Sequence, residues 1–208
     1  TTVTKIISDV DIADREIKFL NIIATRKLKN VLLPLSINYN QRSIVLPKLT
    51  PLSWLPFTSL SIKNKIYIVK QLINGLNEIH NLNIIHNDFK LDNIMYDPNT
   101  LTVKIIDFST SLFCNEQACI SGGTTPLYEC PESNKSIKSD IWSLGICILK
   151  LFNVPDDIIR NLRSMSKLTI DQVIKNHFKN TKNMILIKFA RLCLHPYPEK
   201  RFLLHNFI

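Results

Sequence analysis

Apolar positions recur along the chain with different spacings, and each spacing predicts a type of element. Over residues 62–81 they return every three or four positions, which is typical of a helix with one buried stripe, and Ser61 stands where an N-cap is expected. Residues 14–23 and 184–194 show the same helical spacing. Residues 141–152 are apolar almost all round, which predicts a helix buried on every side.

Shorter apolar runs predict β-strands. They cover residues 3–7, 31–35 and 43–49, and a polar turn at 38–42 separates the last two. A tight turn at 97–100 joins two further strands in the middle of the chain. Helices and short strands therefore occur together, with the strands gathered in the first half.

Composition and charge narrow the class of protein. The 208 residues are 45% apolar, which suits one globular domain or a domain with a fragment. No stretch approaches the roughly 18 to 20 apolar residues of a membrane helix, and no secretory signal is seen, so we expect no membrane association. The formal charge of +9 comes from lysines spread along the chain, without a basic stripe interleaved with aromatic residues. Nucleic-acid binding is therefore not expected.

The five cysteines show no CxxC spacing. Cys147 and Cys193 fall within apolar helical patterns, which favours buried thiols over disulfides or metal ligands. We therefore expect an intracellular, reducing compartment, the cytoplasm or the nucleus.

Four polar side chains follow two apolar runs in the middle of the chain. Asp88, Lys90 and Asn93 come after the run that begins at Ile84, and Asp107 follows the run at 103–106. Two carboxylates, an amine and an amide gathered in this way suit a divalent cation, a phosphate and a hydroxyl nucleophile.

These residues carry a resemblance to protein kinases. Residues 86–93 read HNDFKLDN and residues 107–109 read DFS, which resemble the HxDxKxxN catalytic loop and the DFG metal-binding segment of that family. Three more landmarks follow in order. TPLYECPE at 125–132 resembles the end of the activation loop, and DIWSLG at 140–145 resembles the start of the large buried helix. PEKR at 198–201 resembles the late segment whose arginine pairs with the glutamate of APE.

The resemblance implies an α+β, protein kinase-like fold of two lobes. Residues 1–49 are expected to form a reduced, β-rich N-lobe with the hinge, and residues 50–208 a complete helical C-lobe that begins with a proline-containing linker. None of the four glycines lies in a GxGxxG pattern, so the glycine-rich strands of the family are absent from this chain.

The resemblance assigns catalytic and metal-binding roles. Asp88 would accept the proton of the substrate hydroxyl, and Lys90 would reach the transferring γ-phosphate. Asn93 and Asp107 would hold Mg²⁺, a cation that prefers oxygen ligands. The hydroxyl of Thr125 would bridge Asp88 and Lys90. An inherited but inactive set of the same residues, as in pseudokinases, is the alternative.

The resemblance also implies an ATP site. Lys5 would hold the α- and β-phosphates and Glu16 would anchor it, although their separation of 16 − 5 = 11 residues is shorter than usual in the family. A surface lysine and a solvated helix glutamate are the alternative. Leu46 would be the gatekeeper, residues 47–49 the hinge that contacts adenine, and Met95 would lie beneath the ring. The expected cofactor-binding residues are Lys5, Glu16, Leu46, Lys48, Leu49 and Met95.

Supporting residues complete the expected core. By resemblance, Leu20, Leu35, Phe108 and His86 form the hydrophobic spine that joins a helix to the metal-binding loop, and Asp140 anchors its base. Glu132 and Arg201 are expected to form a buried ion pair.

Several residues depart from the family pattern. Ser109 replaces the glycine of DFG, and a Cβ there restricts positive φ. Asn87 replaces the arginine that binds an activation-loop phosphate, so we expect activity that does not require phosphorylation at Ser121, Thr124 or Thr125. Asp92 aligns with an acidic position that some kinases use to read a basic substrate, whereas Lys150 occupies another such position with the opposite charge.

The sequence thus favours an ATP- and Mg²⁺-dependent serine/threonine protein kinase acting on a protein substrate. Asp92 is open to two interpretations, recognition of a basic substrate or a solvated loop carboxylate. Lys90 and Thr125 indicate the serine/threonine class by resemblance. Small-molecule phosphotransferases share the HxDxxxxN loop but are disfavoured by the later landmarks. The alternative is a truncated kinase or pseudokinase that regulates other kinases by mimicry. The small size and the HND loop also resemble protein kinases of large DNA viruses, baculovirus-type in particular, which would act in an infected host cell.

Overall fold

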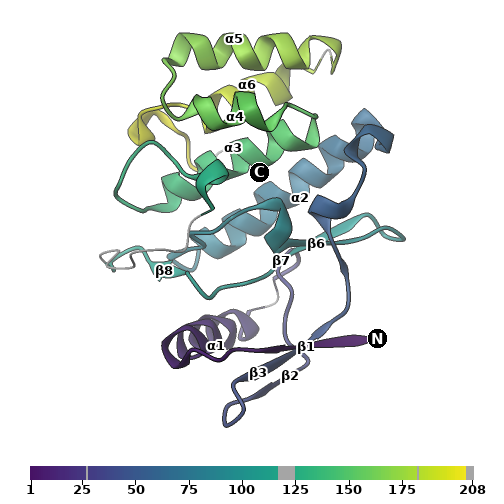
Figure 1. The fold of residues 1–208 in the computed structure, drawn as a ribbon, viewed down its shortest axis with the longest axis vertical. Helices are drawn as coiled ribbons and strands as arrows, with labels where there is room; N and C mark the ends of the chain where they lie inside the picture. Colours follow the sequence, from purple (N-terminus) through teal and green to yellow (C-terminus); the bar gives the residue numbers. More distant parts are fainter. Residues whose placement is uncertain (27, 117–124, 182, 205–208) are drawn as a thin grey trace.

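A three-stranded antiparallel sheet and one helix make up the N-terminal part of the molecule in this computed structural model, which describes residues 1–26, 28–116, 125–181 and 183–204. The sheet has the order β1-β3-β2 and is drawn at the bottom of Figure 1 beside helix α1. Its strands are β1 (Thr2–Ile6), β2 (Ser36–Asn38) and β3 (Ser43–Pro47), and α1 covers Val10–Ala24.

The strand predictions for this part were right in two places and wrong in one. β1 and β3 lie where residues 3–7 and 43–49 were expected to form strands. The strand expected at 31–35 is absent, and β2 begins only at Ser36. Val31 and Leu32 are buried, and Val31 makes one isolated bridge to Ile105. These residues are apolar because the segment crosses the core. A short apolar run does not by itself distinguish such a buried segment from a β-strand.

Helix α1 begins earlier than its apolar pattern indicated. Asp9 caps the helix by accepting a hydrogen bond from the Ile12 N–H at 3.0 Å. The buried residues follow helical spacing and include one carboxylate. They are Ala13, Glu16, Ile17, Phe19, Leu20 and Ile23.

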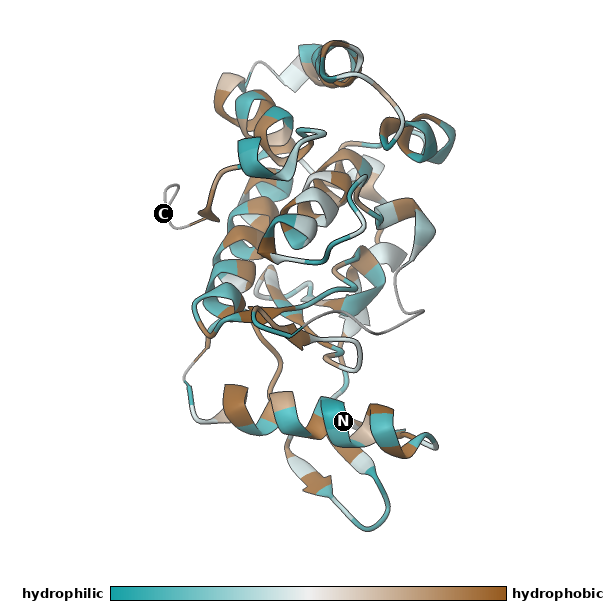
Figure 2. Ribbon diagram, turned by 90° about the vertical axis from the view of Figure 1, so that its left-hand side faces the viewer, coloured by the Kyte–Doolittle hydropathy of each residue, from teal (hydrophilic) through white to brown (hydrophobic). Residues whose placement is uncertain are grey.

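The larger part of the molecule is helical and occupies the upper two thirds of Figure 1. Its helices are α2 (Ile62–His80), α3 (Ile137–Leu151), α4 (Asp156–Leu162), α5 (Lys167–Phe178) and α6 (Met184–Cys193). Ser61 caps α2 as expected, by accepting from the Asn64 N–H at 3.2 Å. α3 is buried on nearly every side, and Figure 2 shows the brown, apolar faces of the helices turned toward one another. None of the described helices has both the length and the apolar character needed to cross a membrane.

Two small sheets lie between the N-terminal part and the helices. One has the order β4-β6-β7, with β4 at Thr50–Pro51, β6 at Ile94–Asp97 and β7 at Thr102–Ile105. The other pairs β5 (Ile84–Ile85) with β8 (Leu112–Phe113). The loops that follow β5 and β7 carry the polar residues singled out in the sequence, so these strands hold the candidate site at the junction of the two parts.

Candidate active site

A buried carboxylate at the start of α3 holds the loop after β5. Asp140 is 1% exposed, and its two oxygens accept the backbone N–H groups of His86 at 2.8 Å and Asn87 at 2.9 Å. His80 Nε2 lies 3.0 Å from the same carboxylate. Three contacts to one rigid side chain fix the backbone immediately before Asp88, which is the anchoring expected of Asp140.

Asp88, Lys90, Asn93 and Thr125 form one hydrogen-bonded cluster. Lys90 Nζ lies 2.6 Å from Asp88 Oδ2, and Asn93 Nδ2 donates to the same oxygen at 3.1 Å. The Thr125 hydroxyl donates to Asp88 Oδ1 at 3.0 Å and accepts from Lys90 Nζ at 2.7 Å. The expected threonine bridge between aspartate and lysine is therefore present. It orients the Asp88 carboxylate and brings the segment after residue 124 to the catalytic loop.

A second cluster joins the N-terminal part to the loop after β7. Lys5 Nζ donates to Glu16 Oε1 at 2.9 Å and Oε2 at 2.7 Å, and to Asp107 Oδ1 at 3.0 Å. The strand β1 supplies the amine, α1 supplies Glu16, and Asp107 comes from the far side of the junction. The short separation of 11 residues along the chain thus suffices for the ion pair, and the surface alternative for Lys5 and Glu16 is excluded because Glu16 is 3% exposed.

The electrostatics of this cluster follow from burial and charge. Burial alone would lower the pKa of Lys5, but the charges of Glu16 and Asp107 outweigh it and raise the pKa above 10.5. Burial raises the pKa of Glu16, and the charge of Lys5 offsets only part of that effect. Burial would likewise raise the pKa of Asp107, yet Lys5 and hydrogen bonds from Ser109 bring that pKa below its ordinary value. Asp107 therefore stays ionised near neutral pH.

Ser109 takes a different role from the one expected. Among the described non-glycine residues, Asp107 has a positive φ of 68°, whereas Ser109 does not. Ser109 therefore needs no left-handed backbone in this structure, and its Cβ is compatible with the conformation that the loop adopts. Its hydroxyl instead donates to Asp107 Oδ1 at 2.6 Å, and its N–H lies 3.3 Å from the same oxygen.

Two oxygens of the site have the chemistry of a Mg²⁺ ligand set. The hydrogen bonds of Asn93 use its Nδ2, and those of Asp107 use its Oδ1. No donor among the described residues reaches Asn93 Oδ1 or Asp107 Oδ2. The two loops are tied together because the Ile106 N–H donates to the Asn93 carbonyl at 2.9 Å. One carboxylate and one amide oxygen, completed by phosphate oxygens and water, fit Mg²⁺.

The expected adenine-binding residues lie along one side of the junction. Leu46 is part of β3 and packs partly buried against the core, and Leu49 follows it, half-buried, between β3 and β4. Met95 lies in β6 opposite Pro51 of β4, two residues after the expected hinge. The N–H of Lys48 donates to the Thr1 carbonyl at 3.1 Å, so it is already used within the protein.

The hydrophobic support of the site matches the expectation except at one residue. Leu20, His86 and Phe108 are buried, and the His86 and Phe108 rings lie 5.2 Å apart. The assignment of Leu35 to this spine is wrong, because Leu35 is 60% exposed. It precedes β2 on the outside of the small sheet, whereas the strand that was meant to bury it does not form there.

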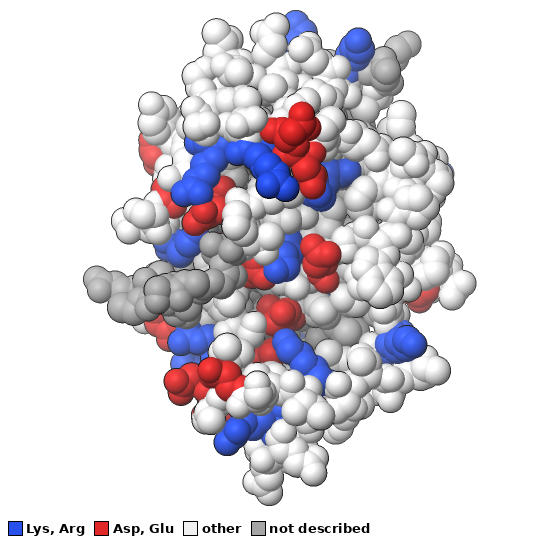
Figure 3. Space-filling view, viewed as in Figure 1, with Lys and Arg blue, Asp and Glu red and all other residues white. Residues whose placement is uncertain are grey.

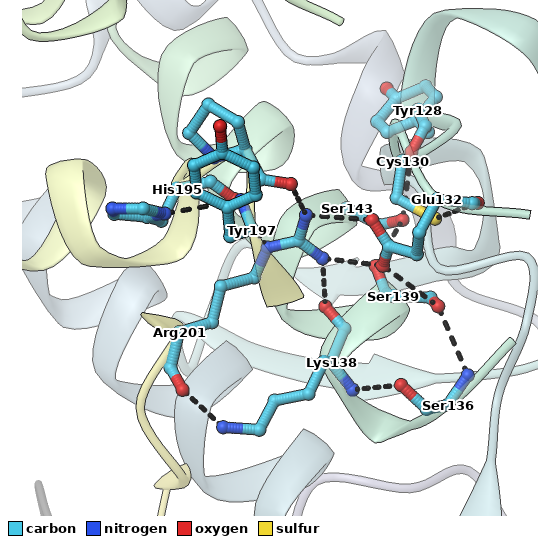
Figure 4. Close-up of polar contacts among 11 residues, drawn as sticks. Tyr128, Cys130, Glu132, Ser136, Lys138, Ser139, Ser143, His195, Tyr197 and Arg201 are labelled. Atoms are coloured by element: carbon cyan, nitrogen blue, oxygen red, sulfur yellow. Dashed lines mark hydrogen bonds and ion pairs between the residues drawn. The ribbon is translucent and has the colours of Figure 1, made fainter. Parts of the chain in front are cut away.

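The pair formed by Glu132 and Arg201 is confirmed. Arg201 Nη1 lies 2.6 Å from Glu132 Oε1, and Nη2 donates to Oε2 at 2.8 Å. Figure 4 shows the guanidinium between the carboxylate and backbone carbonyls, among them that of Lys138 at 2.8 Å. Burial would raise the pKa of Glu132, but the hydrogen bonds and charge of Arg201 lower it below 4.5. This two-point contact ties the end of the activation segment to the C-terminal segment.

Other contacts around the site were not foreseen. Asn87 has a φ of 68°, a conformation that asparagine tolerates better than most residues, and its Nδ2 donates to the Thr110 carbonyl at 3.1 Å. Arg15 of α1 donates to the Ser111 carbonyl at 3.2 Å. The asparagine at position 87 could have indicated a positive φ from the sequence. Nothing in the pattern of α1 indicated that Arg15 contacts Ser111. Ser121 and Thr124, two of the residues considered for phosphorylation, lie outside the described residues.

Comparison with known proteins agrees with this geometry. The sequence profile of the protein kinase domain matches residues 39–208. The chain is 34% identical over 140 residues to the probable serine/threonine-protein kinase mkcC of Dictyostelium discoideum, which covers 65% of this chain and 16% of that protein. It is 30% identical over 149 residues to the MAP kinase kinase PBS2 of Saccharomyces cerevisiae, covering 65% of this chain and 22% of that protein.

A third relative is the serine/threonine-protein kinase ksp1 of Schizosaccharomyces pombe, which is 32% identical over 162 residues, covering 67% of this chain and 32% of that protein. The chain thus spans less than a third of the length of each of these three relatives. The profile match extends over most of the chain and includes every landmark from the catalytic loop to the late arginine. The chain belongs to the protein kinase domain family, with an α+β fold of two lobes.

Proposed function

We propose that this protein transfers the γ-phosphate of ATP to serine or threonine hydroxyls of a protein substrate, with Mg²⁺ as the metal cofactor. The observation that carries the proposal is the Thr125 hydroxyl bridging Asp88 and Lys90, next to a lysine that contacts both Glu16 and Asp107. An inactive relic has no need of such a complete set of contacts. Two of the relatives named above are serine/threonine-protein kinases and the third is a MAP kinase kinase, which supports the same activity.

Each side chain has a distinct task in this reaction. Asp88 accepts the proton of the substrate hydroxyl. The hydroxyl oxygen bonds to the γ-phosphorus while the bond between that phosphorus and the ADP oxygen breaks. Lys90 offsets negative charge on the transferred phosphoryl group. Lys5, positioned by its ion pair with Glu16, holds the α- and β-phosphates. Mg²⁺, when bound by Asn93 and Asp107, neutralises phosphate charge. Catalysis rests chiefly on positioning and charge, because the protein forms no covalent bond to the substrate.

A basic substrate is the favoured class. Asp92 is exposed in the short 3₁₀ helix after Lys90, and its carboxylate has no partner among the described residues. Lys150, whose charge opposed this assignment, is bound to Asp156 at 2.7 Å, so its charge is compensated locally. A hydroxyl flanked by arginine or lysine therefore suits the site better than one flanked by carboxylates.

Activity without activation-loop phosphorylation is part of the proposal. Asn87 stands where the family has a phosphate-binding arginine and is bound to the Thr110 carbonyl instead. The Thr125 hydroxyl is engaged by Asp88 and Lys90, so a phosphate on it would bring negative charge against Asp88. Both observations favour a site that is assembled without modification.

The proposal also includes a reducing compartment, whereas a viral source and nucleic-acid binding find no support. The described cysteines are free thiols, and three of the four are buried, which suits a reducing compartment such as the cytoplasm or nucleus. The relatives named above give no support to a viral source, because they come from Dictyostelium discoideum and two yeasts. On the face drawn in Figure 3, acidic and basic groups alternate without a continuous basic stripe, which gives no support to nucleic-acid binding.

The alternative is a regulatory mimic that binds other kinases and transfers no phosphate. One experiment separates the two. Purified chain is incubated with Mg²⁺, labelled ATP and either a basic or an acidic protein, alongside Asp88→Asn, Asp107→Asn and the control Asp157→Asn, an exposed carboxylate on α4. We expect phosphate incorporation that both site variants abolish and the control retains. Equal incorporation by the wild type and the site variants, or none by any of them, contradicts the enzyme and favours the mimic.

A further inference from the structure

A cluster of side chains joins α1 to the segment that follows the metal-binding loop. It consists of Arg15, Lys18 and Phe19 on α1 and of Phe113 and Glu116 beyond it, and we call it the α1 clamp. We propose that the α1 clamp holds α1 in the position that keeps Glu16 on Lys5, so that the ATP site is assembled without a phosphate. This inference rests on the proposed kinase function and names positioning residues for it.

The centre of the clamp is aromatic. The rings of Phe19 and Phe113 lie 4.9 Å apart at an interplanar angle of 47°, within the range of favourable aromatic pairs. Lys18 Nζ lies 4.9 Å from the centroid of the Phe113 ring, which adds a cation–π contact. Phe19 is 1% exposed, so the aromatic contact is shielded from water on the side of α1.

Charged contacts flank the aromatic pair. Lys18 Nζ lies 3.8 Å from Glu116 Oε1, and Glu116 Oε2 accepts the Phe113 N–H at 3.1 Å. Arg15 donates to the Ser111 carbonyl at 3.2 Å. Because Lys18 and Glu116 are 56% and 36% exposed, their ion pair is weak alone. Phe113 is therefore the central residue of the α1 clamp, and Glu116 supplies a carboxylate near Lys18.

The segment that carries Phe113 is itself fixed to the helical part. β8 pairs with β5 through Ile84 opposite Phe113 and Ile85 opposite Leu112. The Ser111 hydroxyl donates to the His86 carbonyl at 3.2 Å, and the Cys114 N–H donates to the Asn83 carbonyl at 2.9 Å. Phe113 thus lies in a strand that is fixed beside the catalytic loop, and α1 packs against Phe113.

The clamp and the ATP site share one rigid element. Lys18 and Phe19 lie within one turn of Glu16 on α1. A rotation or shift of the helix that breaks the contact of Phe19 with Phe113 also moves Glu16 relative to Lys5. Holding Phe19 therefore holds the ion pair that positions the phosphate-binding lysine.

The test compares the wild-type protein with three variants, all treated with phosphatase. Phe113→Leu keeps an apolar residue in β8 but removes the ring, Lys18→Glu places two like charges together, and Lys18→Glu/Glu116→Lys restores the opposite charges. Lys63→Glu, at an exposed lysine of α2, makes the same charge change away from the clamp. Hydrogen exchange of α1 amides is measured in the nucleotide-free protein, and MgATP affinity is measured by calorimetry.

We expect faster exchange in α1 and a MgATP dissociation constant raised about threefold to tenfold in Phe113→Leu and Lys18→Glu. The swapped double variant should recover only part of the loss, because a lysine at position 116 cannot accept the Phe113 N–H, and Lys63→Glu should match the wild type. Wild-type exchange and affinity in both single variants, or equal losses in Lys63→Glu, overturn the inference. Neither readout requires turnover, so loss of phosphate transfer in the wild type counts against the proposed function and not against the clamp.

Discussion

The Ser109 hydroxyl donates to the Asp107 carboxylate, and this is the shortest hydrogen bond to Asp107 among the described residues. Ser109→Ala removes the 2.6 Å hydrogen bond and keeps the Cβ. A hydrogen bond to a charged group contributes about 1.5 kcal/mol or more, so we expect the KM for MgATP to rise about tenfold. Steady-state kinetics at varied Mg²⁺ measures this. Thr110→Ala is the matched control, since the Thr110 hydroxyl has no partner among the described residues, and an equal change in both variants would refute the role of Ser109.

Asp92 provides a test of substrate class at the same scale. Asp92→Asn should raise the KM for a peptide with arginine near the acceptor serine by about twofold to fivefold, because an exposed charge pair contributes about 0.2–1 kcal/mol. The KM for the peptide with glutamine in place of arginine should stay unchanged. Peptide kinetics at low salt measures both values. A loss that is equal for the two peptides argues against recognition of a basic substrate by Asp92.

At the scale of elements, the contact between Glu132 and Arg201 holds the end of the activation segment against the C-terminal segment. Arg201 has a fully buried side chain, so Glu132→Gln leaves an uncompensated charge. We expect the free energy of unfolding to fall by about 3–5 kcal/mol near pH 7. Denaturant unfolding measures it, and Glu199→Gln, at an exposed carboxylate in the adjacent 3₁₀ helix, should have little effect.

The same pair predicts a pH dependence with a definite sign. The folded-state pKa of Glu132 lies below 4.5 because of Arg201. Ionised Glu132 therefore contributes stability that is present above its unfolded-state pKa and is lost as the pH falls through the folded-state pKa. The difference in unfolding free energy between wild type and Glu132→Gln should accordingly shrink below about pH 4.5. A difference that stays constant from pH 7 to pH 3 would show that the ion pair is not its cause.

At the scale of the whole molecule, the ATP site draws on both parts of the chain. Lys5 and Glu16 come from the N-terminal part, whereas Asn93 and Asp107 come from the loops next to the helices. MgATP at about 100 times its dissociation constant should stabilise the fold by about 2.7 kcal/mol, which raises Tm by about 5–10 °C for a chain of this size. Thermal unfolding with and without Mg²⁺ measures the shift. Asp107→Asn should lose the part that depends on Mg²⁺, and an undiminished Mg²⁺-dependent shift in that variant would remove Asp107 from the metal site.

Local patterns were sufficient for much of the architecture and the site. The apolar stripe and the serine cap located α2, because a helix with one buried face shows its period of about 3.6 residues in the sequence. The nearly unbroken apolar run located α3, because a helix buried on every side is apolar all round. The residues of the catalytic loop were identifiable because phosphoryl transfer needs particular carboxylates, an amine and an amide at close spacing. The strand expected at 31–35 failed because a short apolar run has no period long enough to distinguish a strand from a buried crossing.

The sequence by itself located α2 and α6 and most of α1 and α3, since a helical pattern depends on residue type and short-range spacing. By resemblance it also named the residues that are expected to carry the chemistry. Only the tertiary structure decided that Lys5 reaches Asp107 across 102 positions, that Leu35 faces solvent, and that Ser109 binds the metal-loop carboxylate. It also decided that Phe19 meets Phe113. The contacts of Lys5 with Asp107 and of Phe19 with Phe113 depend on how the N-terminal part is placed against the helices. That placement is set by packing between residues far apart in the chain, which no local pattern records.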